Sequence, residues 1–168
     1  MSIENFSLIK VNNRGAYKIC DNFLTNSELK DCINLALEKY SSKKRTVAPG
    51  SGYGDIEWFQ YELEKDNLAV CKFLSKFEIS VKDITLCVIY YLEPNASIHP
   101  HRDLTGASVN NRIRFHIPLI TNDKLEFVVD NKKVVMNVGD LWILDTSFKH
   151  HVFNGGTTSS AHIIIECR

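Results

Sequence analysis

The chain has 168 residues, 44% of them hydrophobic and 24% charged, and its 20 basic side chains are balanced by 20 acidic ones. This composition excludes collagen-like, low-complexity and disordered proteins, and the zero net charge argues against nucleic-acid binding. No stretch approaches the roughly 20 apolar residues of a membrane helix and the first residues lack a signal-peptide pattern, so we expect a cytoplasmic protein with one domain over residues 1–168.

Residues 1–83 are predicted to form a mainly helical portion. Thr25–Glu28 has the form of a capping box, in which a hydroxyl and a carboxylate satisfy free amides at the start of a helix. Apolar residues at helical spacing follow it and predict a helix from about Asn26 to Tyr40. Asp66 and Asn67 are candidate caps of a second helix. Its predicted apolar face consists of Val70, Phe73, Leu74 and Phe77.

Residues 84–168 are predicted to form a β core. Short runs rich in Val, Ile, Leu, Phe and Tyr alternate with turn residues about every ten positions, which is typical of an antiparallel sheet or barrel. Asp130–Asn131 predicts a tight hairpin turn between two of these runs. The expected strands are 84–92, 112–119, 124–129, 132–138, 140–144, 151–154 and 162–167.

One predicted strand, Arg112–Leu119, has two different faces. Its odd-numbered positions are all apolar, whereas its even-numbered positions include Arg114 and His116. A polar face turned to solvent would explain this pattern. If the helices instead cover the odd-numbered positions, Arg114 and His116 point into the barrel, where polar side chains usually indicate a ligand.

All six histidines lie in the predicted β core. His101 and Asp103 form a His-x-Asp pair, which on an extended segment puts both side chains on one face, where they can bind one metal ion. The third ligand is His150 or His151, and spacing alone does not separate the two. Two histidines and one carboxylate on one face of an octahedron are the triad of non-heme Fe(II) oxygenases. His99, His151 and His162 are expected to be ordinary surface or core residues.

These residues stand in motifs that resemble a known family. Pro100–Asp103, Asn111–Leu119, Gly139–Trp142 and Asp145–Val152 occur in the order found in the aspartyl/asparaginyl β-hydroxylase family of 2-oxoglutarate-dependent Fe(II) oxygenases. The resemblance covers nearly half of the chain. It implies a mainly β fold, the double-stranded β-helix (a cupin-like jelly roll), with the N-terminal helices packed on one of its sheets.

The resemblance also implies the metal ligands. His101, Asp103 and His150 fall on the positions of the family's iron ligands, so they are the expected metal-binding and catalytic residues. His150 is preferred over His151 because the run Asp-x-Ser-Phe-x-His aligns it with the family's distal histidine. The expected metal is Fe(II).

Further residues are implied for the cosubstrate, 2-oxoglutarate. Arg114 and His116 fall on an Arg-x-His-x-Pro-Leu motif that helps to form the cosubstrate pocket in the family, and Tyr90 is expected to add a hydroxyl there. One position departs from the family pattern. Ser160 stands where an arginine usually binds the distal carboxylate of 2-oxoglutarate, and a serine cannot replace that bidentate contact.

Three explanations of Ser160 stay open. Arg112, Arg114 or Arg168 supplies the missing charge, another cosubstrate binds, or oxygenase activity has been lost. The expected function is that of an Fe(II)/2-oxoglutarate-dependent dioxygenase that hydroxylates an unactivated C–H bond of a small substrate, such as an amino acid or a metabolite. The alternatives are a cupin-like protein that binds metal or a small molecule without oxidising it, an oxygenase with an atypical cosubstrate site, and a metal-dependent isomerase or hydrolase.

Overall fold

The computed structural model describes residues 15–41, 58–64, 66–103 and 113–168. The described residues form strands, two α-helices and one turn of 3₁₀ helix. In chain order these are β1 (Ala16–Cys20), α2 (Asn26–Ser41), β2 (Trp58–Glu62), α3 (Leu68–Phe77), η1 (Val81–Asp83), β3 (Ile84–Leu92), β4 (Ser97–His101), β5 (Ile113–Ile120), β6 (Leu125–Val129), β7 (Lys132–Val134), β8 (Leu141–Leu144), β9 (His150–Asn154) and β10 (Ser160–Cys167).

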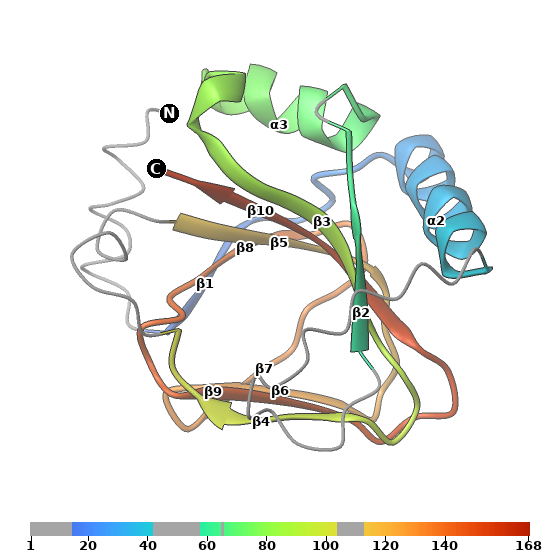
Figure 1. Cartoon of the computed structure of the whole chain (residues 1–168), viewed down its shortest axis with the longest axis vertical. Helices are drawn as coiled ribbons and strands as arrows, with labels where there is room; N and C mark the ends of the chain where they lie inside the picture. Colours follow the sequence, from blue (N-terminus) through green and yellow to red (C-terminus); the bar gives the residue numbers. More distant parts are fainter. Residues whose placement is uncertain (1–14, 42–57, 65, 104–112) are drawn as a thin grey trace.

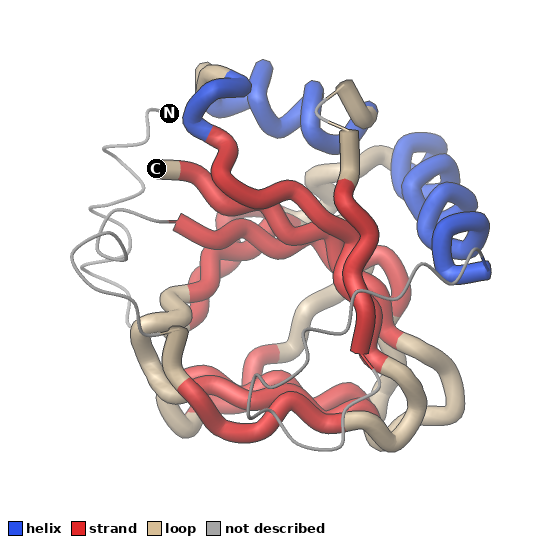
Figure 2. The backbone as a smooth tube through the Cα atoms, in the orientation of Figure 1, coloured by secondary structure: helices blue, strands red, loops and turns tan. Residues whose placement is uncertain are grey.

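The strands form two sheets that face each other across the interior of a barrel (Figure 1). The larger sheet has six strands in the order β1-β8-β5-β10-β3-β2, and the smaller has four in the order β4-β9-β6-β7. Neighbouring strands are antiparallel in both sheets. Helices α2 and α3 cover the outer face of the larger sheet, whereas the described part of the chain places no helix on the smaller one (Figure 2). The predicted double-stranded β-helix with helices on one sheet is confirmed.

Both helices begin as their sequences predict. At α2 the Thr25 amide donates to Oε2 of Glu28 over 2.7 Å, and the Glu28 amide lies 3.4 Å from Oγ1 of Thr25, which is the reciprocal pattern of a capping box. At α3 the Oδ1 of Asn67 accepts from the Ala69 amide over 3.0 Å. The helix ends at Phe77 and is capped by Glu78, whose φ of 55° is left-handed.

The main core lies between the helices and the outer face of the larger sheet. Phe73 of α3 packs edge-on against Phe115 of β5, with ring centroids 4.7 Å apart. Tyr91 of β3 reaches α2, where its hydroxyl donates to the Ala36 carbonyl over 2.7 Å. Each fully buried side chain of this size contributes about 2–3 kcal/mol from burial. This packing decides which face of the larger sheet is closed.

The closed face settles the orientation of β5. Its odd-numbered residues, from Ile113 to Leu119, are buried in the core under the helices. Alternation along the strand then turns Arg114 and His116 into the barrel, where both line an internal cavity. Of the two interpretations of this strand, the one in which Arg114 and His116 point inward is confirmed.

Several strand predictions need correction. Strands β1, β2 and β4 were not predicted, and each lies at the edge of its sheet. Edge strands bury little of their surface and so carry a weak apolar pattern, and Pro100 interrupts that of β4. The strand expected over 132–138 ends at Val134. The hairpin turn at Asp130–Asn131 is confirmed, with positive φ at both residues.

Neither described helix is both long and apolar enough to cross a membrane.

Candidate metal and cosubstrate site

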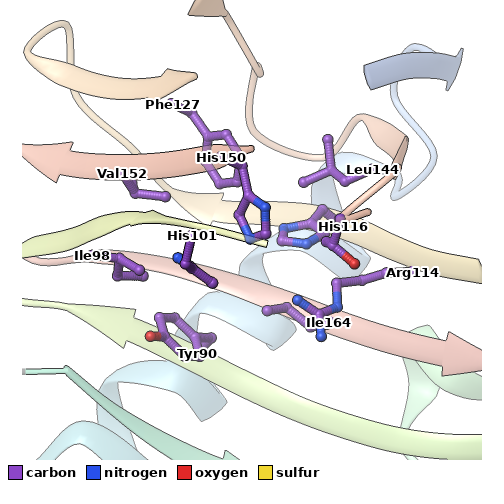
Figure 3. A pocket seen from close by; sticks show the side chains of 11 residues that line it. Tyr90, Ile98, His101, Arg114, His116, Phe127, Leu144, His150, Val152 and Ile164 are labelled. Carbon is purple, nitrogen blue, oxygen red and sulfur yellow. The ribbon is translucent and has the colours of Figure 1, made fainter. Parts of the chain in front are cut away.

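A cavity of about 170 Å³ opens into the barrel between the two sheets (Figure 3). Its wall combines apolar side chains with a few polar ones that come from both sheets. The lining residues are Tyr90, Ile98, His101, Arg114, His116, Phe127, Leu144, Thr146, His150, Val152 and Ile164.

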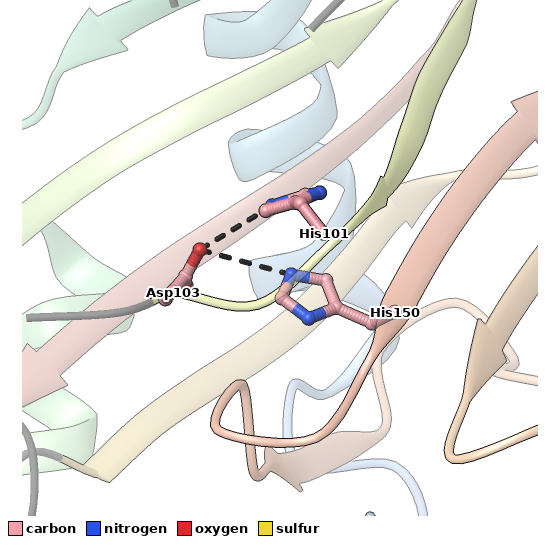
Figure 4. Close-up of side chains that lie close together, drawn as sticks. All are labelled: His101, Asp103 and His150. Atoms are coloured by element: carbon pink, nitrogen blue, oxygen red, sulfur yellow. Dashed lines mark ion pairs between the residues drawn. The ribbon is translucent and has the colours of Figure 1, made fainter. Parts of the chain in front are cut away.

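Three of the predicted residues converge at this cavity (Figure 4). His101 ends β4 and His150 begins β9, and the register of these paired strands sets the two residues directly opposite each other. Asp103 follows β4 and is held by a backbone hydrogen bond to the Thr146 carbonyl of 3.0 Å. The Oδ1 atom of Asp103 lies 3.3 Å from Nε2 of His101 and 3.9 Å from Nε2 of His150. One ligand atom from each residue lies within 4.8 Å of the others, close enough to share one ion.

The two imidazoles are oriented by the backbone. Nδ1 of His101 lies 2.7 Å from the His99 carbonyl, and Nδ1 of His150 lies 3.0 Å from the Phe148 carbonyl. A carbonyl only accepts, so each Nδ1 carries the proton and each neutral ring keeps the lone pair of Nε2. Backbone partners of this kind orient metal-binding histidines. The donor set therefore fits a divalent first-row metal such as Fe(II), with two imidazole nitrogens and one carboxylate.

Burial and neighbouring charges shift the pKa values of all three candidate donors. Burial raises the pKa of Asp103, but the hydrogen bond from the protonated His101 ring and the charge of Arg114 outweigh it and hold this pKa well below its usual range. Burial lowers the pKa of His150, in spite of the Phe148 carbonyl and Asp103. At His101 burial also lowers the pKa, but Asp103 and the His99 carbonyl outweigh it and raise the pKa above its ordinary value. Asp103 is thus ionised and stabilises positive charge at this point.

Arg114 links the metal donors to the opposite sheet. Its Nη1 lies 2.7 Å from Oδ2 of Asp103, and its Nε donates to Oε1 of Glu166 over 2.6 Å. Its Nη2 also pairs with Glu166. Glu166 stands directly across from Arg114 in the β5–β10 register and is buried. All three guanidinium nitrogens are therefore engaged by carboxylates.

Beyond Arg114 lies a pair of buried histidines. His116 of β5 and His162 of β10 meet edge-to-face with ring centroids 5.8 Å apart, and the ring of Phe127 stacks on His162. Neither nitrogen of His116, nor Nε2 of His162, has a hydrogen-bond partner among the described residues. Burial lowers the pKa of His162 to about 4 and, with the charges of His162 and Arg114, that of His116 well below its ordinary value. Each unsatisfied buried polar group costs about 1–3 kcal/mol.

The structure brings the predicted site residues to one place. His101, His150, Arg114, His116 and Tyr90 line the same cavity, and Asp103 lies beside them.

Ser160 is buried at the start of β10, but it does not line this cavity. Arg168 is exposed after the end of β10, and Arg112 lies outside the described residues. Glu166 and His162 were not predicted as site residues. The signal that could have identified them is the alternation along β10, since Ser160, His162, Ile164 and Glu166 share the inward face.

Solved structures share this fold at low sequence identity. The viral collagen prolyl hydroxylase of Paramecium bursaria Chlorella virus-1, solved as a 2-oxoglutarate complex, aligns with a TM-score of 0.65 over 94% of this chain and 98% of its own, at 13% identity. A prolyl hydroxylase from Trichoplax adhaerens, in complex with a hypoxia inducible factor fragment, aligns with a TM-score of 0.68 over 98% and 90%, at 17% identity. HygX from Streptomyces hygroscopicus, with nickel and 2-oxoglutarate bound, gives 0.62 over 96% and 85%, at 12% identity.

The family comparison is more specific than the shared fold. The model of the aspartyl/asparaginyl β-hydroxylase family matches residues 27–168, which include α3, all of α2 except its first residue, every strand except β1, and every residue of the cavity. The chain therefore belongs to the aspartyl/asparaginyl β-hydroxylase family.

Proposed function

We propose that the protein hydroxylates an unactivated C–H bond of a small substrate, an amino acid or a metabolite, with Fe(II) held by His101, Asp103 and His150. Family membership makes it a non-heme Fe(II), 2-oxoglutarate-dependent dioxygenase. The observation that carries the residue assignment is the donor geometry, in which two backbone-oriented imidazoles face one carboxylate oxygen. Two solved structures of similar fold support the binding of a metal and 2-oxoglutarate here: HygX holds nickel and 2-oxoglutarate, and the viral prolyl hydroxylase was solved as a 2-oxoglutarate complex.

The bound groups supply the oxidative chemistry. When Fe(II) and 2-oxoglutarate are present, O₂ is consumed, 2-oxoglutarate is converted to succinate and CO₂, and one oxygen atom enters the substrate C–H bond. The chain contributes orientation and exclusion of water. Its apolar wall residues, among them Ile98, Phe127 and Leu144, keep water from the cavity, and a volume of about 170 Å³ supports a small substrate.

Arg114 is proposed to position the carboxylate ligand. It holds Oδ2 of Asp103, so that Oδ1 stays turned toward the two histidines. Glu166 offsets the charge of Arg114, which otherwise would repel a divalent cation at the donors. His116 and Tyr90 are proposed to contact the cosubstrate from the cavity wall.

The test is succinate formation from 2-oxoglutarate with Fe(II) and ascorbate, measured over a panel of free amino acids and related metabolites. We expect turnover to fall at least about a hundredfold in His101→Ala and Asp103→Ala. Loss of a residue that only hydrogen-bonds to a metal ligand lowers activity by about 10- to 100-fold, and loss of a ligand itself should lower it further. The control is His151→Ala, since this histidine adjoins His150 but does not line the cavity.

Two results would contradict the proposal. Equal turnover in Asp103→Ala and the unsubstituted protein would show that other residues hold the metal. Metal binding with no succinate on any member of the panel would favour the cupin-like binding protein, for which the serine at position 160 is the specific argument.

A further inference from the structure

The cavity has little free positive charge for a dicarboxylate. Among the described lining residues, Arg114 alone carries a permanent positive charge. Its guanidinium already pairs with Asp103 through Nη1 and with Glu166 through Nε and Nη2. Ser160 has no charge to offer, and Arg168 is exposed beyond the end of the strand. A distal carboxylate that entered the barrel would therefore need another partner.

Two inward-facing histidines provide unused hydrogen-bonding atoms. His116 lines the same cavity as His101 and His150, and His162 lies on the same face of β10 as Ser160, two residues further along the strand. Three of their four ring nitrogens are buried without a hydrogen-bond partner in the described part of the chain. Buried polar atoms in folded proteins nearly always have a partner. These nitrogens therefore point to a ligand group that the chain itself does not supply.

We propose that His116 and His162 together bind the distal carboxylate of 2-oxoglutarate, in place of the arginine that is replaced by Ser160. The inference rests on the proposed function, because it assigns the far end of the same cosubstrate. Each neutral imidazole has one N–H to donate, so two rings can hold both oxygens of one carboxylate. Hydrogen bonds to an ionised acceptor are about twice as strong as neutral ones.

The position of the pair suits an elongated ligand. His116 follows Arg114 on the inward face of β5, so a ligand whose 2-oxo acid end lies at the metal donors extends along β5 toward His116. Phe127 lines the metal cavity and also a second cavity of about 340 Å³, which His162 lines. The two histidines and Phe127 thus stand at the wall between these cavities, where the far end of the ligand would stop.

The experiment compares two ligands on the Fe(II)-loaded protein without oxygen. Calorimetry gives the dissociation constants of 2-oxoglutarate and of 2-oxobutyrate, which keeps the metal-chelating end but lacks the distal carboxylate. We expect His162→Leu to weaken 2-oxoglutarate binding about tenfold or more and to leave 2-oxobutyrate binding unchanged, since only the dicarboxylate reaches the histidines. The matched control, His151→Leu, should change neither constant.

A second readout does not depend on a substitution. In the unsubstituted protein loaded with Zn(II), the imidazole NMR signals of His116 and His162 should shift on addition of 2-oxoglutarate and stay in place with 2-oxobutyrate. Unchanged signals, or equal affinity of His162→Leu and the unsubstituted protein for 2-oxoglutarate, would overturn the inference while leaving the proposed function intact. If neither ligand binds the unsubstituted protein, the proposed function itself fails.

Discussion

The two faces of the larger sheet are made by the same strands but hold different chemistry. Along β5, Ile113, Phe115 and Ile117 lie under the helices, whereas Arg114 and His116 face the barrel. Along β10, the outward residues are equally apolar, and the inward face carries His162 and Glu166. On β5 and β10, the outer face has no ionisable side chain other than Cys167, and the inner face has charged and unsatisfied polar groups. Stability is thus concentrated on one side of a strand and the site on the other.

The largest expected effect comes from breaking the outer face alone. Phe115→Ala should lower the free energy of unfolding by about 3–5 kcal/mol, because it opens a cavity between α3 and the larger sheet. Urea unfolding monitored by circular dichroism measures this loss. Metal affinity of the folded variant should stay within about twofold, since no donor touches this face.

The control for that experiment is Phe153→Ala. Phe153 is 40% exposed on β9 of the smaller sheet, so its loss should change stability by no more than about 0.5 kcal/mol. A similar destabilisation in both variants would mean that packing on the outer face of the larger sheet contributes no more to stability than an exposed residue of the smaller sheet.

The second prediction concerns the inner face, where the buried His162 should make the free energy of unfolding depend on pH. Burial lowers the pKa of His162 to about 4, whereas the unfolded chain has a pKa near 6.5. Between these values the unfolded state binds more protons, so the stability is complete above pH 6.5 and is lost as the pH falls below it. From pH 8 to pH 5, the metal-free protein should lose roughly 2 kcal/mol on account of His162.

Urea titrations at the two pH values test this expectation, with His162→Leu as the comparison. Between the two pH values, the free energy of unfolding of the variant should fall by roughly 2 kcal/mol less than that of the unsubstituted protein, because leucine takes up no proton. A pH dependence that is the same in both proteins would show that His162 is not held neutral by its burial.

The smallest effect concerns the charge balance of the inner face. Glu166→Gln keeps an oxygen that accepts from Arg114 but removes the negative charge, which leaves the guanidinium charge to act on the metal donors. Metal affinity should fall about tenfold, or about 1.4 kcal/mol, in the range found for partners of metal ligands. Competition with a chelator of known affinity measures it. Glu126→Gln, on an exposed residue of β6, should have no effect, and an equal loss in both would refute the role of Glu166.

The sequence was informative where one face differed clearly from the other. In β5 every odd-numbered residue is apolar, so covering that face by helices was enough to orient Arg114 and His116. In β10 three successive isoleucines, Ile163 to Ile165, occupy both faces, and their pattern does not reveal which face is inward. His162 and Glu166 were missed for this reason. The pairing of Glu166 with Arg114 depends on strand register, which a single sequence does not encode locally.

The candidate metal donors were predicted from a motif instead of from periodicity. His101 and Asp103 are close in the chain, whereas His150 is brought next to them by the register in which β4 pairs with β9. Strand β4 itself was predicted only as an extended segment, because it is a short edge strand with a proline. The family resemblance therefore supplied a contact that neither hydrophobic pattern nor spacing could supply.

The two halves of the site come from different sheets. His101 lies on β4 and His150 on β9 of the smaller sheet, and Asp103 follows β4. Arg114 and His116 project from the larger sheet. Ser160 likewise lies on β10 of the larger sheet, whereas the three candidate donors do not. Substitutions in different layers of the barrel therefore act on the candidate metal donors and on the proposed cosubstrate contacts, and Arg114, which pairs with both Asp103 and Glu166, connects the two layers.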